Sequence, residues 1–111
     1  MDNQYMDFEH IENFINFQYN LGCYYYYFEK NMLQALNYFQ LAANNNHIKA
    51  KIIINSNDFQ YNLGWYYYNN KNILQALYYF QLAANNNHIK AKKMMDILTP
   101  IMKIYKKEND K

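Results

Sequence analysis

Apolar side chains recur with the period of an α-helix in two parts of the chain. In the first part they occupy positions i, i+1, i+4, i+7 and i+8, namely Ala35, Leu36, Phe39, Ala42 and Ala43. The second part repeats this spacing at Ala76, Leu77, Phe80, Ala83 and Ala84. Such spacing gathers the apolar groups on one face of a helix. The pattern therefore predicts two amphipathic helices.

Another helix is predicted before each of these two, over residues 17–28 and 59–68. In the later segment the residues on one helical side are Phe59, Leu63, Tyr66 and Tyr67. Short polar connectors follow both segments, at residues 29–31 and 69–72. Two helices joined by a short turn form an antiparallel hairpin, so we expect one hairpin in each part of the chain.

Glycine and asparagine refine this picture. Gly22 and Gly64 lie inside predicted helices, where glycine costs about 1 kcal/mol relative to alanine. We expect each glycine to mark a close helix–helix crossing, which the small Ala35 and Ala76 would complete on the second helix of each hairpin. Asparagine tolerates the left-handed conformation that ends helices, so we expect helices to stop at the two asparagine triplets, residues 44–46 and 85–87.

The two parts are copies of each other. Residues 17–51 and 59–92 are identical at 29 of 34 aligned positions, once one residue of the first copy is left unpaired. Their starts are 42 residues apart, a period typical of helical solenoids, propellers or arrays. The helical pattern selects the first option. We therefore expect an all-α fold, a short α-solenoid of two antiparallel hairpins within a single domain, residues 1–111.

The segments outside the copies are predicted to be helical as well. We expect a capping helix on the N-terminal side and capping helices over residues 88–108 on the C-terminal side. Thr99 and Pro100 fit the N-cap and first turn of a last helix. All four residues of 55–58 are good N-caps. Periodicity leaves open whether residues 47–69 form one long helix or two.

The spacing within the copies resembles the tetratricopeptide repeat. In the second copy the residues that carry this resemblance are Leu63, Gly64, Tyr67, Ala76, Phe80 and Ala83. In the first copy they are Leu21, Gly22, Tyr25, Ala35, Phe39 and Ala42, with one extra residue before Ala35. The QYNLG opening and the Ala-Ala-x-x-x-His-x-x-Ala ending are similar to the Sel-like repeat. Asn46 and Asn87 stand where Sel-like repeats have glycine.

This resemblance implies an α-solenoid that works as an adaptor or scaffold. Its first helices would line a concave binding face, and Tyr25 and Tyr67 would pack inside. The residues implied for the concave face of the first copy are Asn16, Tyr19, Cys23, Tyr26 and Tyr27. The matching residues of the second copy are Asp58, Tyr61, Trp65, Tyr68 and Asn69.

Exposed tyrosine and tryptophan are typical of interaction hot spots. The predicted face contains no Lys or Arg to clamp carboxylates or phosphates. We therefore expect a protein or peptide partner with an apolar, aromatic or proline-containing segment. In the alternative interpretation, the rings pack against the N-terminal segment or a second copy.

Charge and composition narrow the choice further. The net charge is +2, with 14 Tyr and no Arg. Residues 1–16 are acidic and lack Lys, whereas residues 90–111 carry seven Lys. These lysines leave nucleic-acid binding as a less favoured hypothesis, because the net charge is low. Self-assembly is the second hypothesis, since two hairpins are few for a repeat protein.

Other classes of function find no support in the residues. Cys23 is the single cysteine and has no predicted base beside it, so we expect neither a disulfide nor an enzyme. His47 and His88 occur once per repeat and would point in parallel, which suits a structural role better than a metal site. We expect no cofactor. Without a signal peptide or a transmembrane segment, the sequence favours a cytoplasmic protein.

Overall fold

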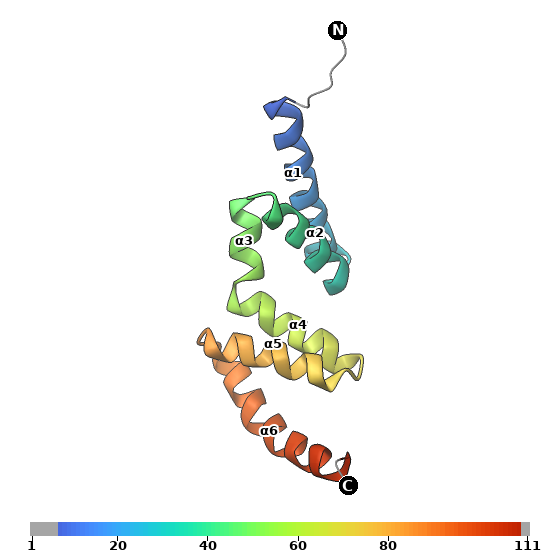
Figure 1. Ribbon diagram of the computed structural model, residues 1–111, viewed down its shortest axis with the longest axis vertical. Helices are drawn as coiled ribbons and strands as arrows, with labels where there is room; N and C mark the ends of the chain where they lie inside the picture. The colour runs from blue at the N-terminus through green and yellow to red at the C-terminus, as the bar shows by residue number, and fades with distance from the viewer. Residues whose placement is uncertain (1–6, 110–111) are drawn as a thin grey trace. The chain divides into compact units, whose positions relative to one another are not determined.

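The computed structural model describes residues 7–109, and these residues form helices and short connections without a β-strand (Figure 1). The fold is therefore all-α, as the periodicity predicts. The chain divides into two compact units, residues 1–54 and residues 55–111. Because residues 1–6, 110 and 111 lie outside the described part, so do Asp2, Asp110 and Lys111 of the charged segments.

Unit 1 contains three helices and one π-helical turn. They are α1 (Phe8–Cys23), its π-helical continuation η1 (Tyr24–Phe28), α2 (Met32–Asn44) and α3 (Ile48–Ile54). Helix α2 packs along α1 and η1, and α3 packs against α2. The predicted hairpin is thus present, but its first helix starts at Phe8 and not at residue 17. The separate N-terminal capping helix was a wrong prediction for the described residues, because the chain stays helical from Phe8 through Cys23.

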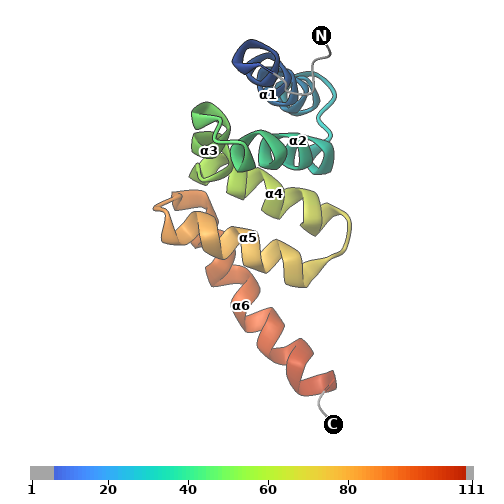
Figure 2. The same cartoon turned by 45° about the horizontal axis from the view of Figure 1, so that its top comes forward.

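Unit 2 repeats this order with α4 (Asn57–Asn69), α5 (Ile73–Asn85) and α6 (Ile89–Asn109). Figures 1 and 2 both show α4 and α5 side by side, with α6 leaving from the end of α5. The stretch 47–69 is two helices, because Ser56 caps α4 by accepting a hydrogen bond from the Phe59 N–H at 3.3 Å. One of the four candidate N-caps therefore ends the ambiguity that periodicity left open.

The C-terminal part corrects a prediction. Thr99 and Pro100 do not begin a new helix, because α6 continues through them to Asn109. A proline inside a helix removes one backbone hydrogen bond and usually bends the helix. Here Leu98, Met102 and Tyr105 keep the i, i+4, i+7 spacing across the proline. A continuous helix therefore keeps these apolar side chains on one face, and residues 88–108 hold a single helix instead of several.

Equivalent residues end the helices in both units. Asn46 and Asn87 have φ angles of 68° and 67°, in the left-handed region predicted for the asparagine triplets. At the hairpin turns, Lys30 and Lys71 take the same region at 55° and 63°. The next residue at each turn, an asparagine, caps the second helix with its side chain. Local sequence thus terminates each helix at a defined residue.

Each core is centred on a phenylalanine and a glycine. Phe39 and Phe80 are fully buried, and their rings lie directly on Gly22 and Gly64. A Cβ atom added to either glycine would come within 2.5 Å of the ring. The expected close crossing is present, but the phenylalanine rings supply the nearest atoms, not Ala35 and Ala76. Glycine is required because the space that a side chain would fill is occupied by an aromatic ring.

Candidate functional site

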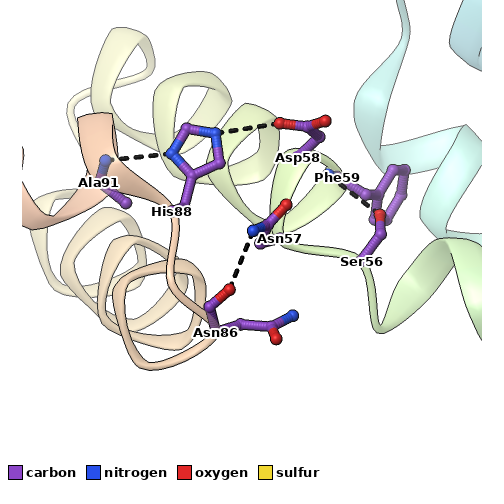
Figure 3. A network of polar contacts seen from close by, with 7 residues as sticks. All are labelled: Ser56, Asn57, Asp58, Phe59, Asn86, His88 and Ala91. Carbon is purple, nitrogen blue, oxygen red and sulfur yellow. Dashed lines mark hydrogen bonds and ion pairs between the residues drawn. The ribbon is translucent and has the colours of Figure 1, made fainter.

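The histidine of unit 2 lies at the corner between α5 and α6 (Figure 3). His88 accepts a hydrogen bond from the Ala91 N–H at its Nδ1 atom, over 3.1 Å. Because Nδ1 is an acceptor, the proton of the neutral ring is on Nε2, which donates to the Asp58 carboxylate at 3.0 Å. The ring also stacks on Tyr61 with centroids 4.2 Å apart. His88 therefore caps α6 and ties it to α4.

His47 makes the same contacts in unit 1. Its Nδ1 accepts from the Ala50 N–H at 3.2 Å, its Nε2 donates to the Asn16 amide oxygen at 3.1 Å, and its ring stacks on Tyr19. Burial lowers the pKa of His47, and the nearby Lys49 cation acts in the same direction. Both histidines are accounted for by helix capping. Within residues 7–109, no three His, Cys, Asp or Glu side chains gather as metal ligands would.

The predicted aromatic residues of unit 2 form a line along α4. Tyr61 meets Trp65 edge-on at 6.3 Å between centroids, and Trp65 meets Tyr68 at 5.3 Å. Tyr61 and Trp65 also contact the buried Phe80, each at 5.7 Å. Tyr68 and Asn69 lie at the exposed end of this line. The rings of Tyr61 and Trp65 therefore belong to the core on one side, and only the outer edge of this line is accessible to a partner.

The matching line in unit 1 differs because cysteine replaces tryptophan. Cys23 leaves room for Tyr26 to contact Phe39, with centroids 6.3 Å apart. Tyr19 is half-buried against the same ring, and burial together with a hydrogen bond to Cys23 raises the pKa of Tyr19 to about 12. Tyr27 is exposed on the π-helical turn. Of the predicted residues in unit 1, Tyr27 and Asn16 are thus the most open to solvent.

Tyr25 and Tyr67 were predicted to pack inside. Each is half-buried and stacks almost parallel on a tyrosine of the facing helix, Tyr38 at 5.7 Å and Tyr79 at 5.5 Å. Burial raises the pKa of Tyr67 and of Tyr79. These pairs close the turn end of each hairpin and leave the opposite end to the histidines.

A groove that the sequence analysis missed lies beside His47 in unit 1. It encloses about 710 Å³ between α1 and the corner where α2 meets α3. Its apolar lining residues are Phe8, Ile11, Ile15, Tyr19 and Ile48. Four asparagine side chains complete it, those of Asn16, Asn20, Asn45 and Asn46. The signal was present as Phe8, Ile11, Ile15 and Tyr19 at i, i+3, i+7 and i+11, and the first three precede residue 17, where we expected the first helix of the hairpin to start.

The corresponding corner of unit 2 is closed by hydrogen bonds. Asn57 donates from Nδ2 to the Asn86 carbonyl oxygen at 2.9 Å (Figure 3). The Asn86 Nδ2 group in turn donates to the Asn55 carbonyl oxygen at 3.0 Å. In unit 1 the equivalent of Asn57 is Ile15, whose side chain has no amide group to donate a hydrogen bond. Where unit 2 has a side chain that ties the corner together, unit 1 therefore has one that contributes to the apolar wall of the groove.

A buried glutamine pair shows a second difference. In unit 1 the Asn45 amide donates to the Gln18 side-chain oxygen at 3.2 Å. In unit 2 the equivalent Asn86 turns to Asn55, and the buried Gln60 Oε1 has no hydrogen-bond partner within residues 7–109. An unpaired buried acceptor loses its contact with water without a replacement, so Gln60 carries a desolvation cost that the pairing with Asn45 offsets for Gln18.

Charge is distributed unevenly around these sites. Glu12 and Lys49 both line the groove of unit 1, so its rim carries both signs. Asp7, which caps α1, and Glu9 in its first turn add further acidic side chains at the start of this helix. Across residues 7–109, every helix is too short or too polar to cross a lipid bilayer.

No protein-family model, curated protein or solved structure matches this chain. The likeness to tetratricopeptide and Sel-like repeats therefore rests on the residues and their spacing.

Proposed function

We propose that this protein is a protein-interaction module of the tetratricopeptide-like or Sel-like kind, an adaptor or scaffold. Its binding site would be the groove of unit 1 between α1 and the α2–α3 corner. The observation that carries the proposal is the groove itself, whose apolar lining is bordered by asparagine amides. Phe8 lines this groove and is 90% exposed, so its ring is accessible to a ligand.

The lining defines the chemistry of the ligand. Phe8, Ile11 and Ile15 offer apolar area for the side chains of a partner segment. The Asn45 Nδ2 group donates to Gln18 and Leu41, and the Asn46 Oδ1 atom accepts from Lys51. The remaining Asn45 Oδ1 acceptor and Asn46 Nδ2 donor match the N–H and C=O groups of a peptide backbone. With one acidic and one basic side chain at the rim, the groove lining alone does not select a ligand of either charge. The proposed ligand is therefore a peptide segment with apolar side chains.

Two members of the predicted tyrosine-rich face, Asn16 and Tyr19, also line this groove. The exposed Tyr27 would extend the surface along the π-helical turn. In unit 2 the aromatic line along α4 packs largely on Phe80, so it would contribute less of the surface that contacts a partner. The α-solenoid arrangement of the two hairpins is part of the same proposal, supported by their repeated sequence and equivalent caps.

The experiment uses short peptides selected from a displayed random library on the wild-type chain. Their affinity is then measured by fluorescence anisotropy for three variants. Phe8→Gln with Ile11→Gln alters the groove, whereas Tyr27→Ala with Tyr68→Ala alters the exposed tyrosines. Ile89→Gln, at the exposed start of α6 in unit 2, is the matched control.

We expect the groove variant to lose about tenfold or more in affinity, a loss common for truncated anchor residues. The control should bind like wild type. If the tyrosine variant loses binding while the groove variant keeps it, the site is the tyrosine-rich face. If no peptide depends on either surface, the proposal is wrong. Circular dichroism of each variant verifies that the helices remain.

A further inference from the structure

The second half of α6 presents an apolar stripe to solvent. Ile97, Ile101 and Ile104 are 57%, 52% and 64% exposed, at the i, i+4, i+7 spacing of one helical face. The last buried residue of α6 is Leu98, at 4% exposure. Three isoleucines in a row on a solvent-exposed helix face are an unpartnered surface, because such side chains gain free energy only when they are covered.

The stripe of α6 and the apolar wall of the unit 1 groove have matching lengths. Phe8, Ile11 and Ile15 extend over seven residues of α1, and Ile97 to Ile104 extend over seven residues of α6. At 1.5 Å per residue, each covers about 10 Å of helix. Two helices can therefore align their apolar residues along the whole of both stripes.

Helices α1 and α6 carry net charges of opposite sign. Helix α1 begins with the exposed Glu9 and Glu12 after Asp7, and no lysine occurs before Lys30. Helix α6 carries six lysines, which are Lys90, Lys92, Lys93, Lys103, Lys106 and Lys107. Its acidic residues are Asp96 and Glu108. Complementary charge favours the encounter of these two helices and disfavours pairing of either with itself.

Taking the proposed function of the groove as its basis, we infer that the partner is a second copy of this chain. The α6 stripe of one copy would occupy the groove of the other, with Lys103 and Lys107, which follow one flank of the stripe, directed at the Glu12 carboxylate on the groove rim. The two surfaces differ, so the contact is heterologous. Each copy carries one groove and one stripe. Two copies can therefore form both contacts with each other, or further copies can add to the free groove and stripe at the ends of the assembly.

The test is a complementation experiment by analytical ultracentrifugation. The first variant, Phe8→Gln with Ile11→Gln, has only a working stripe. The second, Ile101→Gln with Ile104→Gln, has only a working groove. All four side chains are exposed, so folding should be preserved. We expect wild type to associate with rising concentration and each variant alone to stay at the 13.6 kDa of one chain.

An equimolar mixture of the two variants should form a complex of twice that mass, because each supplies the surface that the other lacks. A mixture that stays monomeric, or variants that associate alone like wild type, would overturn the inference. A charge exchange provides a second measurement. Glu9→Lys with Glu12→Lys should weaken association about tenfold, and Lys103→Glu with Lys107→Glu in the other copy should restore it.

The two proposals fail separately. If the wild-type chain stays monomeric but the groove variant loses the selected peptides, the groove serves another protein and only self-docking is wrong. If the mixture dimerises, the groove binds a protein segment and the segment is α6. Added salt should weaken the self-contact, because at 0.1 M ionic strength the attraction between exposed charges decays over a distance of about 10 Å.

Discussion

The two hairpins of this protein differ by one residue in length, and the structure absorbs that residue in the last turn of the first helix. In unit 2 the Asn72 N–H donates to the Tyr67 carbonyl, closing the end of α4. In unit 1 the equivalent bond runs from Asn31 to Tyr25 and encloses one more residue. The Glu29 N–H donates to Tyr24, five residues back, which is the π-helical pattern. The caps on both sides stay in place, so the helix widens instead of shifting register.

A second difference between the hairpins has greater consequences for function. At the corner beside the capping histidine, Asn57 of unit 2 makes a hydrogen bond to Asn86, whereas unit 1 has Ile15 in the equivalent place and a groove. The buried frameworks are the same, with Gly22 under Phe39 and Gly64 under Phe80. Near-identical repeats can therefore share a core and still present different surfaces, because surface contacts depend on single side chains.

The largest expected effect tests whether the two cores are equivalent. Phe39→Ala and Phe80→Ala should each destabilise the chain by about 3–5 kcal/mol, because each removes a fully buried ring and leaves a cavity. Urea unfolding followed by circular dichroism measures both. A loss for one variant that is less than half of the other would show that the two cores are not equivalent.

The next prediction exchanges the corner residues. Asn57→Ala removes the hydrogen bond to Asn86 and should cost about 0.5–1.5 kcal/mol of stability in urea unfolding. Ile15→Asn gives unit 1 the polar residue of unit 2 and should weaken binding of the selected peptides, because an amide replaces part of the apolar wall. If Ile15→Asn binds these peptides as tightly as wild type, Ile15 contributes no contact area to the ligand.

The smallest effect is a pH dependence at His47. Burial holds the pKa of His47 below its usual value of 6.5, so the folded state favours the neutral ring. Its contribution to stability is complete above pH 6.5 and is lost as the pH falls from there through the lower pKa of the folded state. Protonation at Nδ1 also removes the acceptor for the Ala50 N–H.

Asn16→Asp gives His47 the carboxylate that His88 has, and should raise the pKa of His47 by stabilising the charged ring. The loss of stability on acidification should then be smaller. NMR titration of the His47 ring measures the pKa in both proteins. An unchanged or lowered value in the variant would contradict the contact between residues 16 and 47.

Much of the fold could be predicted because its signals are local. The apolar spacing from Ala35 to Ala43 and from Ala76 to Ala84 predicted two helices at their observed places. Left-handed Asn46 and Asn87 follow from the conformational freedom of asparagine. Helix periodicity and helix ends depend on energies within a few neighbouring residues, and the sequence states these directly.

The candidate site could be predicted only in part. The sequence by itself determined that there are two repeated hairpins and that each glycine marks a close helix crossing. It also determined that the first helix begins with acidic residues and that the last helix is rich in lysine. Tertiary structure decided that Phe39 and Phe80 cover the glycines, that α1 begins at Phe8, and that α6 continues through Pro100. The contacts of Asn45 with Gln18 and of Asn57 with Asn86 join residues 27 and 29 positions apart. Such contacts depend on how helices pack, which local preference does not specify, so the groove emerged only once α1 lay beside the α2–α3 corner.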